Sequence, residues 1–214
     1  MISALRRHIQ HSAATNDRVK ALVQSFAGVV RYDLRRWTRV VYERECTRLL
    51  QDIKIDTLDV LEISAGETWQ KMRCRSYRAA NYPEFDICTG TLDQTFDLII
   101  ADQVFEHLLW PNRGARNVLA MLRPGGYFLV ITPFLVRVHE VPNDCSRWTE
   151  TGLRYFLADN GFDLDAIQTG SWGNLACVKA TLVAWSRIGW FASLRNDPAY
   201  PVVVWALARK STAQ

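Results

Sequence analysis

The sequence lacks several features that would assign the protein to a class at once. Its five cysteines are scattered, odd in number and form no C-x-x-C pair, so neither a zinc site of that type nor a disulfide framework is supported. Reduced thiols are the simplest interpretation, and they predict a cytoplasmic location. Internal repeats and low-complexity tracts are absent too.

Long apolar segments are also missing. The N-terminal residues 1–8 contain no long apolar core, so we expect no signal peptide. The most apolar late stretch, residues 175–191, is interrupted by Lys179 and Arg187 and is too polar for a membrane span. The sequence therefore predicts no transmembrane segment.

Dense basic blocks do not occur, although the net charge is +4 and the pI is near 8.9. Arg6–Arg7 and Arg35–Arg36 are pairs rather than runs, which disfavours a nucleic-acid partner. The chain does have 214 residues, of which 49% are hydrophobic and 11% aromatic. That is enough for one domain of about 150 to 200 residues plus an extension.

Apolar runs that alternate with helical periodicity predict an α/β fold with a doubly wound sheet of seven strands. The expected strands are residues 58–64, 76–82, a very short 83–88, 96–101, 127–132, 162–169 and 201–207. The expected helices between them are residues 66–74, 104–110, 112–122 and 149–160.

A helical rhythm before the first strand predicts a helical N-terminal extension over residues 1–55, followed by one domain over residues 56–214. The extension either covers the sheet or forms a lid over the ligand crevice. A Trp-rich helical insertion is expected over residues 172–200, before the last strand. The exposed face of the extension and this insertion are both candidates for a homodimer interface.

The stretch from Asp59 to Trp69 organises the chain. It predicts a buried parallel strand, a tight turn and a helix start, with Glu62 as an acid inside the strand. A buried acid is costly unless it is paired, so its place near the strand end suits a ligand contact. Polar residues also follow other expected strands, namely Asn81, Asp102 with Gln103, and Thr132. Since ligands of open α/β sheets bind at the carboxyl ends of strands, these residues predict a site there.

Three segments together resemble the class I S-adenosylmethionine-dependent methyltransferases. They are Leu61-Glu62-Ile63-Ser64-Ala65-Gly66, Phe96-Asp97-Leu98-Ile99-Ile100-Ala101-Asp102-Gln103-Val104-Phe105-Glu106-His107, and Leu122-Arg123-Pro124-Gly125-Gly126-Tyr127-Phe128. The resemblance implies a Rossmann-like, mostly parallel sheet with an antiparallel last strand, and S-adenosylmethionine as cofactor. It implies the following cofactor-binding residues: Glu62, Ile63, Ser64, Gly66, Asn81, Asp86, Ile87, Asp102, Gln103 and Val104.

Two positions depart from the family pattern. Asn81 stands where the family usually has an acid for the ribose hydroxyls, and Ser64 replaces the first glycine of the turn. The segment from Ser64 to Trp69 also lacks the three-glycine spacing of a nicotinamide-binding turn, which leaves an oxidoreductase as a weak third hypothesis.

Methyl transfer to a hydroxyl is helped by a base, and the catalytic candidates are His139, Asp144 and His107. Each has a structural alternative, as a loop, ion-pairing or helix-packing residue. Arg147, Trp148 and Trp172 are the candidate substrate contacts, with ion pairing or core packing as the alternative. No metal site is expected, because no acids or histidines cluster along the chain.

These features together predict a methyltransferase that acts on a hydroxyl of a small molecule, sugar or glycan. The alternative is a catalytically silent S-adenosylmethionine-binding scaffold that works with a partner, and Asn81 and Ser64 motivate it.

Overall fold

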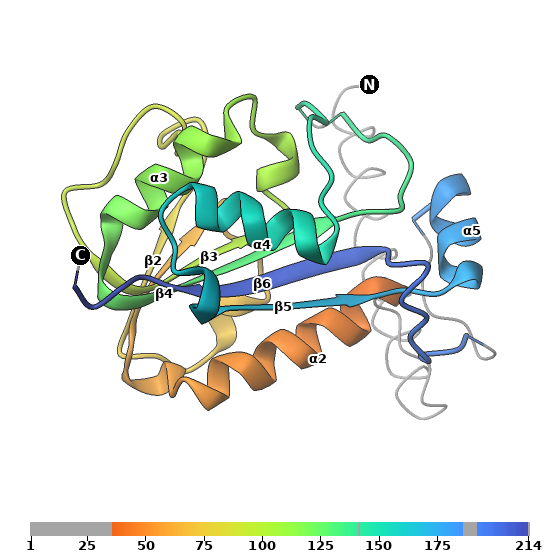
Figure 1. The fold of residues 1–214 in the computed structure, drawn as a ribbon, viewed down its shortest axis with the longest axis horizontal. Coiled ribbons are helices and arrows are strands. Elements are labelled where there is room, and N and C mark those ends of the chain that lie inside the picture. The colour runs from red at the N-terminus through yellow and green to blue at the C-terminus, as the bar shows by residue number, and fades with distance from the viewer. Residues whose placement is uncertain (1–35, 141, 186–191, 214) are drawn as a thin grey trace, which may run out of the picture.

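The computed structural model describes residues 36–140, 142–185 and 192–213. These residues form one six-stranded sheet with helices on both faces (Figure 1). The strands are β1 (Asp59–Ile63), β2 (Ser76–Ala80), β3 (Phe96–Asp102), β4 (Leu122–Pro133), β5 (Ile167–Trp172) and β6 (Val203–Arg209). Their order is β2-β1-β3-β4-β6-β5; β1 to β4 run parallel, and β6 is antiparallel to both of its neighbours. The Rossmann-like, mostly parallel arrangement with an antiparallel last strand is therefore confirmed.

The expected strand at residues 83–88 is not formed, so six strands take the place of the predicted seven in the described part of the chain. This segment folds into consecutive turns: the Phe85 N–H donates to the Asn81 carbonyl, and the Thr89 N–H donates to the Asp86 carbonyl. Pro83 has no N–H to offer a neighbouring strand, which disfavours sheet pairing here. Strand β2 is consequently the edge of the described sheet.

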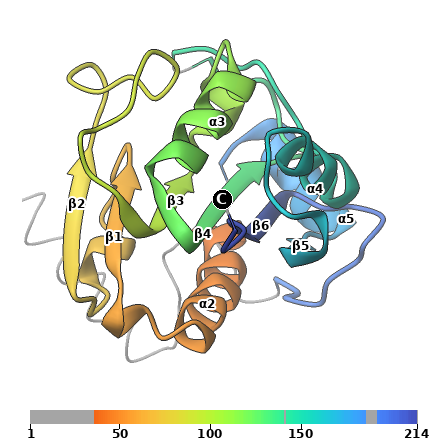
Figure 2. The same ribbon diagram turned by 60° about the vertical axis from the view of Figure 1, so that its left-hand side comes forward.

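Four α-helices cover the sheet within the described ranges (Figures 1 and 2). They are α2 (Trp37–Asp52), α3 (Pro111–Met121), α4 (Glu150–Asp159) and α5 (Leu175–Val183). One buried cluster joins α3 and α4 to the sheet, and a second joins α2 and α5 to it. None of the described helices has both the length and the apolarity to cross a membrane.

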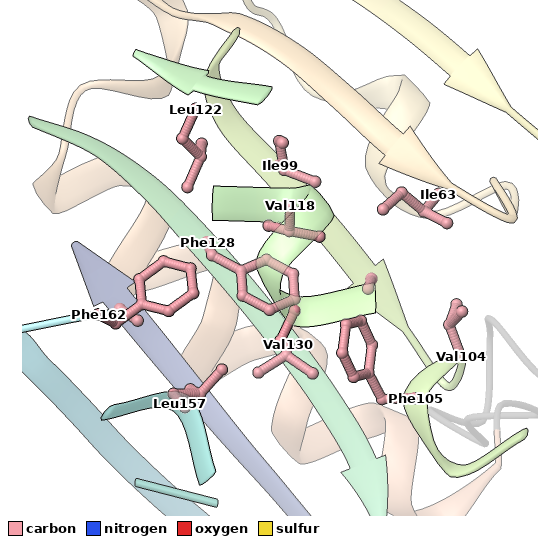
Figure 3. Packing of buried hydrophobic residues seen from close by; sticks show 14 of the residues in the cluster. Ile63, Ile99, Val104, Phe105, Val118, Leu122, Phe128, Val130, Leu157 and Phe162 are labelled. Carbon is pink, nitrogen blue, oxygen red and sulfur yellow. The ribbon is translucent and has the colours of Figure 1, made fainter. Parts of the chain in front are cut away.

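Strand β3 supplies residues to both clusters, which is why its central residues 98–101 are all apolar. Ile99 lies beside Val118 in the first cluster (Figure 3), whereas Leu98 and Ile100 belong to the second. Strand β4 alternates in the same way. The central strands are therefore buried on both faces, and their ends are held rigidly where the polar residues follow.

Several predicted boundaries shift. The helices expected at 66–74 and 104–110 are short 3₁₀ turns, η2 (Trp69–Lys71) and η3 (Phe105–His107). Two more 3₁₀ turns, η1 (Ile55–Thr57) and η4 (Leu164–Ala166), precede β1 and β5, so β5 starts later than residue 162. Strand β4 begins at Leu122 and includes the segment expected to end a helix. The predicted cap of α4 is confirmed, since Thr149 Oγ1 accepts from the Gly152 N–H at 3.0 Å.

The N-terminal extension is described only from residue 36 onwards. There α2 buries Trp37, Val41, Tyr42, Cys46, Leu49 and Leu50 against the sheet, as the covering interpretation expects. Residues 1–35 lie outside the described residues. The interpretation of the extension as a lid, which concerns mainly those residues, is therefore not tested. All five cysteines are free thiols.

An ion-pair network joins β1 and β3 at their amino ends. Asp59 accepts from Arg75 at 2.5 and 2.8 Å, from Ser76 at 2.7 Å and from Arg123 at 2.9 Å. Asp97 accepts from the same two arginines, at 2.6 and 2.8 Å. The hydrogen bonds from Arg75, Ser76 and Arg123 hold the pKa of Asp59 well below its usual range. This network lies at the opposite edge of the sheet from the polar strand ends.

Asp59→Asn is expected to lower the thermal unfolding midpoint at pH 7 by about 3 °C, a small effect because the network is partly open to solvent. Asp59 has a folded-state pKa below its unfolded value of about 3.9. The contribution of Asp59 to the free energy of unfolding is therefore complete above the unfolded-state pKa, and it disappears as the pH falls through the folded-state pKa. Thermal melts at pH 7, 4 and 3 should show the difference from wild type shrinking with acidity. A constant difference over this range would contradict the ionic origin.

Gly173 allows the segment before β6 to lie against the end of β5. A Cβ at this position would come within 2.1 Å of the Tyr200 carbonyl oxygen and 2.5 Å of the Val202 nitrogen. Backbone atoms cannot move aside easily, so Gly173→Ala should lower the free energy of unfolding by about 3 kcal/mol. Gly90→Ala is the matched control, because nothing lies within 4 Å of its Cβ position. Denaturant titrations of both variants test the difference.

Candidate functional site

The turn after β1 is built around Glu62, which is 1% exposed. One carboxylate oxygen accepts from the Gly66 N–H at 3.0 Å, and the other accepts from the Tyr77 hydroxyl at 2.5 Å. Ser64 has a φ of 53°, in the left-handed region where the usual glycine would be unstrained. A Cβ at Gly66 would meet nothing within 4 Å, so the turn is open on that side.

Asn81 follows β2 and ties its end to the same turn. Its Oδ1 accepts from the Ala65 N–H at 2.7 Å, which leaves the amide nitrogen as the donor toward a ligand. Asp86 lies in the turns beyond, where its Oδ1 accepts from the Cys88 N–H at 2.8 Å. Ile87 next to it is 2% exposed and belongs to the first core cluster.

Asp102 ends β3 beside α2. One of its oxygens accepts from Trp69 Nε1 at 3.0 Å and from the Tyr42 hydroxyl at 3.4 Å. The other oxygen is buried and has no hydrogen-bond partner among the described residues. Burial raises the pKa of Asp102 to about 6, and nearby Arg39 and the two donors counteract part of that effect. Gln103 comes next with a φ of 59°, followed by Val104, which is 6% exposed.

Two histidines that are far apart in the sequence meet beyond the ends of β3 and β4. The rings of His107 and His139 lie edge to face with centroids 5.1 Å apart. His107 Nδ1 is 2.5 Å from the Asn143 carbonyl oxygen. A carbonyl can only accept, so Nδ1 carries the proton and Nε2 presents a lone pair. Burial lowers the pKa of His139, which keeps its ring neutral at pH 7.

Asp144 fixes the His139 loop. It accepts the His139 backbone N–H at 2.9 Å, and it forms a two-pronged ion pair with the Arg147 guanidinium. Burial alone would raise the pKa of Asp144, but the Arg147 and His139 donors outweigh it and lower the pKa. The pairing that the sequence left as the structural alternative for these two residues is therefore present.

Glu106 precedes His107 and is completely buried. Neither carboxylate oxygen has a hydrogen-bond partner among the described residues. Burial raises the pKa of Glu106 to about 8. Its backbone carbonyl accepts from the N–H groups of Cys145 and Ser146, which ties η3 to the loop that carries Asp144.

A pocket opens beside these groups. Its lining residues are Arg36, Thr38, Arg39, Tyr42, Gln103, Pro133, Val136, Trp185, Val202 and Val203. Trp185 joins the pocket to the histidines, since its ring lies edge to face with His139 at 5.2 Å. The guanidinium groups of Arg36 and Arg137 lie 5.1 and 5.9 Å from the Trp185 ring centre. The pocket is thus cationic and aromatic, and Tyr42 links it to Asp102.

Residues 44–130 match a family model described as a methyltransferase domain. This segment contains the three sequence segments that resemble the class I S-adenosylmethionine-dependent methyltransferases, and the match supports a methyltransferase domain of that type, with S-adenosylmethionine as its cofactor, over the matched residues. A comparison with proteins of curated function found no match.

Solved structures resemble the methyltransferase in fold. An S-adenosylmethionine-dependent methyltransferase from Mesorhizobium loti is 14% identical with a TM-score of 0.50, over 76% of this chain and 96% of that one. A possible exported protein from Bordetella parapertussis is 12% identical with a TM-score of 0.52, and the match covers 81% of this chain and 68% of that one. The CurJ carbon methyltransferase is 13% identical with a TM-score of 0.51, and the match covers 81% of this chain and 54% of that one. At these identities the likeness concerns the fold alone.

The methyltransferase site fits its cofactor in two observed ways. The unpartnered oxygen of Asp102 offers a buried acceptor for a cationic or N–H donor group. The open side at Gly66 leaves room for a ligand against the turn. Of the residues that the family resemblance implied, Glu62 and Asp102 lie near the carboxyl ends of β1 and β3. The turns that follow β1, β2 and β3 carry four more, namely Ser64, Gly66, Asn81 and Gln103.

Two predicted substrate contacts pack into the protein instead. Trp172 is 2% exposed in the second core cluster, and its Nε1 donates to the Leu194 carbonyl. Trp148 packs on Phe156 with ring centres 5.1 Å apart. A tryptophan pattern in the sequence does not separate core from surface, which is why both were considered. We do not propose either as a substrate contact.

Sequence reasoning did not identify Glu106 or Arg36 as part of this site. Glu106 was visible only as the neighbour of His107, and its burial depends on the loop from Asn143 to Arg147 folding over η3. Nothing along the chain signals that His139 returns to this point. We expected no cluster of acids and histidines because none are grouped along the sequence. The fold nevertheless brings His139 next to His107.

Proposed function

We propose that the domain transfers the methyl group of S-adenosylmethionine to a hydroxyl group of a small-molecule or sugar-type acceptor. The observation that supports this most is the neutral His139, fixed by Asp144 and packed against both His107 and Trp185 of the pocket. An imidazole that is neutral at pH 7 suits a hydroxyl acceptor, which must lose its proton during the transfer.

In this proposal the cofactor lies along the ends of β1, β2 and β3. Glu62 and Gly66 hold its methionine end together with Asp102, Gln103 and Val104, and Ile63 and Ser64 form the adjoining wall. The Asn81 amide donates to the ribose hydroxyls, while Asp86 and Ile87 flank the adenine. Only one carboxylate oxygen of Asp86 accepts a hydrogen bond within the described chain. The other oxygen can accept from the adenine amino group.

S-Adenosylmethionine supplies a methyl group on a positively charged sulfur. The chain must hold the acceptor oxygen about 3 Å from that methyl and in line with the sulfur. The pocket beside Gln103 and Tyr42 is the proposed acceptor site, where the Trp185 ring offers a face for a sugar or ring. Arg147 is fully engaged with Asp144, so it contributes by fixing the His139 loop.

A silent cofactor-binding scaffold is the second candidate, and one observation favours it. Glu62 and Asn81, which stand at positions that contact the cofactor in the family, already form hydrogen bonds within the protein. A scaffold would bind the cofactor and release no S-adenosylhomocysteine with any acceptor.

The test supplies S-adenosylmethionine with a deuterated methyl group and a panel of matched acceptors that differ in one group, hydroxyl, amine or thiol. Our proposal predicts a labelled methyl ether by mass spectrometry, with one S-adenosylhomocysteine for each product. Transfer to nitrogen, sulfur or carbon alone would contradict the hydroxyl assignment. Cofactor binding without product across the panel would favour the scaffold.

A further inference from the structure

Three groups with metal-binding atoms converge where η3 meets the loop after β4. Glu106, His107 and His139 each offer one ligand atom, and all three atoms lie within 4.8 Å of one another. Two of these residues are adjacent in the chain, and the third arrives from a distant loop. The convergence is therefore a product of the fold.

Glu106 is the observation that points to a missing ligand. Its side chain is completely buried, and neither oxygen meets a donor among the described residues. A buried carboxylate without a hydrogen bond is rare in folded proteins, and it calls for a bound group that satisfies it. The Glu106 Oε1 atom lies 3.6 Å from His107 Nε2, so the two side chains present their ligand atoms side by side.

The His107 ring is oriented as that of a metal ligand usually is, and the loop that carries His139 is fixed. The Nδ1–H of His107 is held by the Asn143 carbonyl at 2.5 Å, which leaves Nε2 free on the side of Glu106. His139 is held through its backbone by Asp144, which is itself paired with Arg147. A hydrogen bond from the far nitrogen and a fixed loop are the supports that keep a ligand histidine in place.

We propose that Glu106, His107 and His139 bind one divalent first-row transition-metal ion, such as Zn²⁺. Two imidazole nitrogens and one carboxylate oxygen favour Zn²⁺, Co²⁺ or Mn²⁺ over Mg²⁺, which prefers oxygen ligands. Ligand atoms around tetrahedral zinc lie about 3.3 Å apart. Side-chain rotations that move each ligand atom by roughly 1 Å would bring the three atoms to that spacing.

Three protein ligands leave a fourth position open, the arrangement that catalytic metal sites share. The open position would hold the acceptor hydroxyl, and this part of the inference rests on the proposed function. A hydroxyl bound to a cation loses its proton to water more readily, so the cation would replace His139 as the group that activates the acceptor. The binding of the metal itself does not depend on that reaction.

The test titrates the full chain, freed of metal by chelation, with Co²⁺ and follows the visible absorption of the bound ion, without cofactor or acceptor. We expect one Co²⁺ per chain, displaced by Zn²⁺. Glu106→Gln and His139→Ala should each weaken binding by at least tenfold. His8→Gln/His11→Gln is the matched control, since it removes the two other histidines of the sequence and should bind as wild type does. Thermal melts of the metal-free variants verify that they fold.

Absence of Co²⁺ binding by the wild type would overturn the metal site, as would unchanged binding by Glu106→Gln and His139→Ala. A metal-free protein that still forms methyl ethers at full rate would overturn the catalytic role of the cation and leave methyl transfer standing. One bound Co²⁺ lost in both variants would support the site even where no methyl ether forms, and in that case the proposed function alone would fail.

Discussion

Replacing Glu62 with glutamine is expected to weaken S-adenosylmethionine binding by about 100-fold, or about 2.7 kcal/mol. The carboxylate accepts from the Gly66 N–H and the Tyr77 hydroxyl at once. An amide can accept with only one of its two terminal atoms, so one of these donors would lose its partner. The turn would then lose both its shape and its negative charge toward the cofactor. Calorimetric titration of the variant and wild type measures the ratio.

Two further variants separate charge from geometry at this position. Glu67→Gln changes a neighbouring acid whose side chain is 89% exposed, and it should bind the cofactor as wild type does. Tyr77→Phe removes one donor and keeps the charge, so it should lose roughly tenfold or less. Equal affinities for Glu62→Gln and Glu67→Gln would mean that Glu62 does not shape the cofactor site.

His139→Ala is expected to lower turnover by at least about 100-fold while the affinity for S-adenosylmethionine stays within about twofold. As the base or as a ligand of a bound cation, His139 acts on the hydroxyl rather than on the cofactor. S-Adenosylhomocysteine release under saturating acceptor measures turnover, and calorimetry measures cofactor affinity.

Val138→Ala is the matched control for the His139 substitution, because Val138 is the adjacent residue and its side chain is 73% exposed. It should retain wild-type turnover. A similar loss in both variants would assign the effect to the loop as a whole. Full turnover of His139→Ala would remove His139 from the reaction.

The central strands were predictable because their burial on both faces leaves a direct signature, an unbroken apolar run. Residues 98–101 and 127–131 are such runs, and each lies within a strand of the sheet. The edge was harder to predict. Residues 83–88 contain apolar residues, yet Pro83 and the Asp86 turn satisfy the backbone locally and no strand forms.

The polar residues of the proposed cofactor side were predictable from the sequence, because each lies at or directly after the carboxyl end of a strand. Asn81 and Asp102 illustrate this, since parallel strand ends converge at one edge of the sheet. The acceptor side depends on loops, whose paths are set by contacts between distant segments. The approach of His139 to His107 and the stacking of Arg36 on Trp185 are contacts of this kind.

The central claim is that the open turns after β1, β2 and β3 bind S-adenosylmethionine. The most direct test is calorimetric titration of the wild-type protein with S-adenosylmethionine, S-adenosylhomocysteine and NAD. Our account predicts saturable micromolar binding of the first two ligands and no binding of NAD. Absence of binding to both sulfur ligands up to millimolar concentration, or saturable binding of NAD in their place, would contradict it.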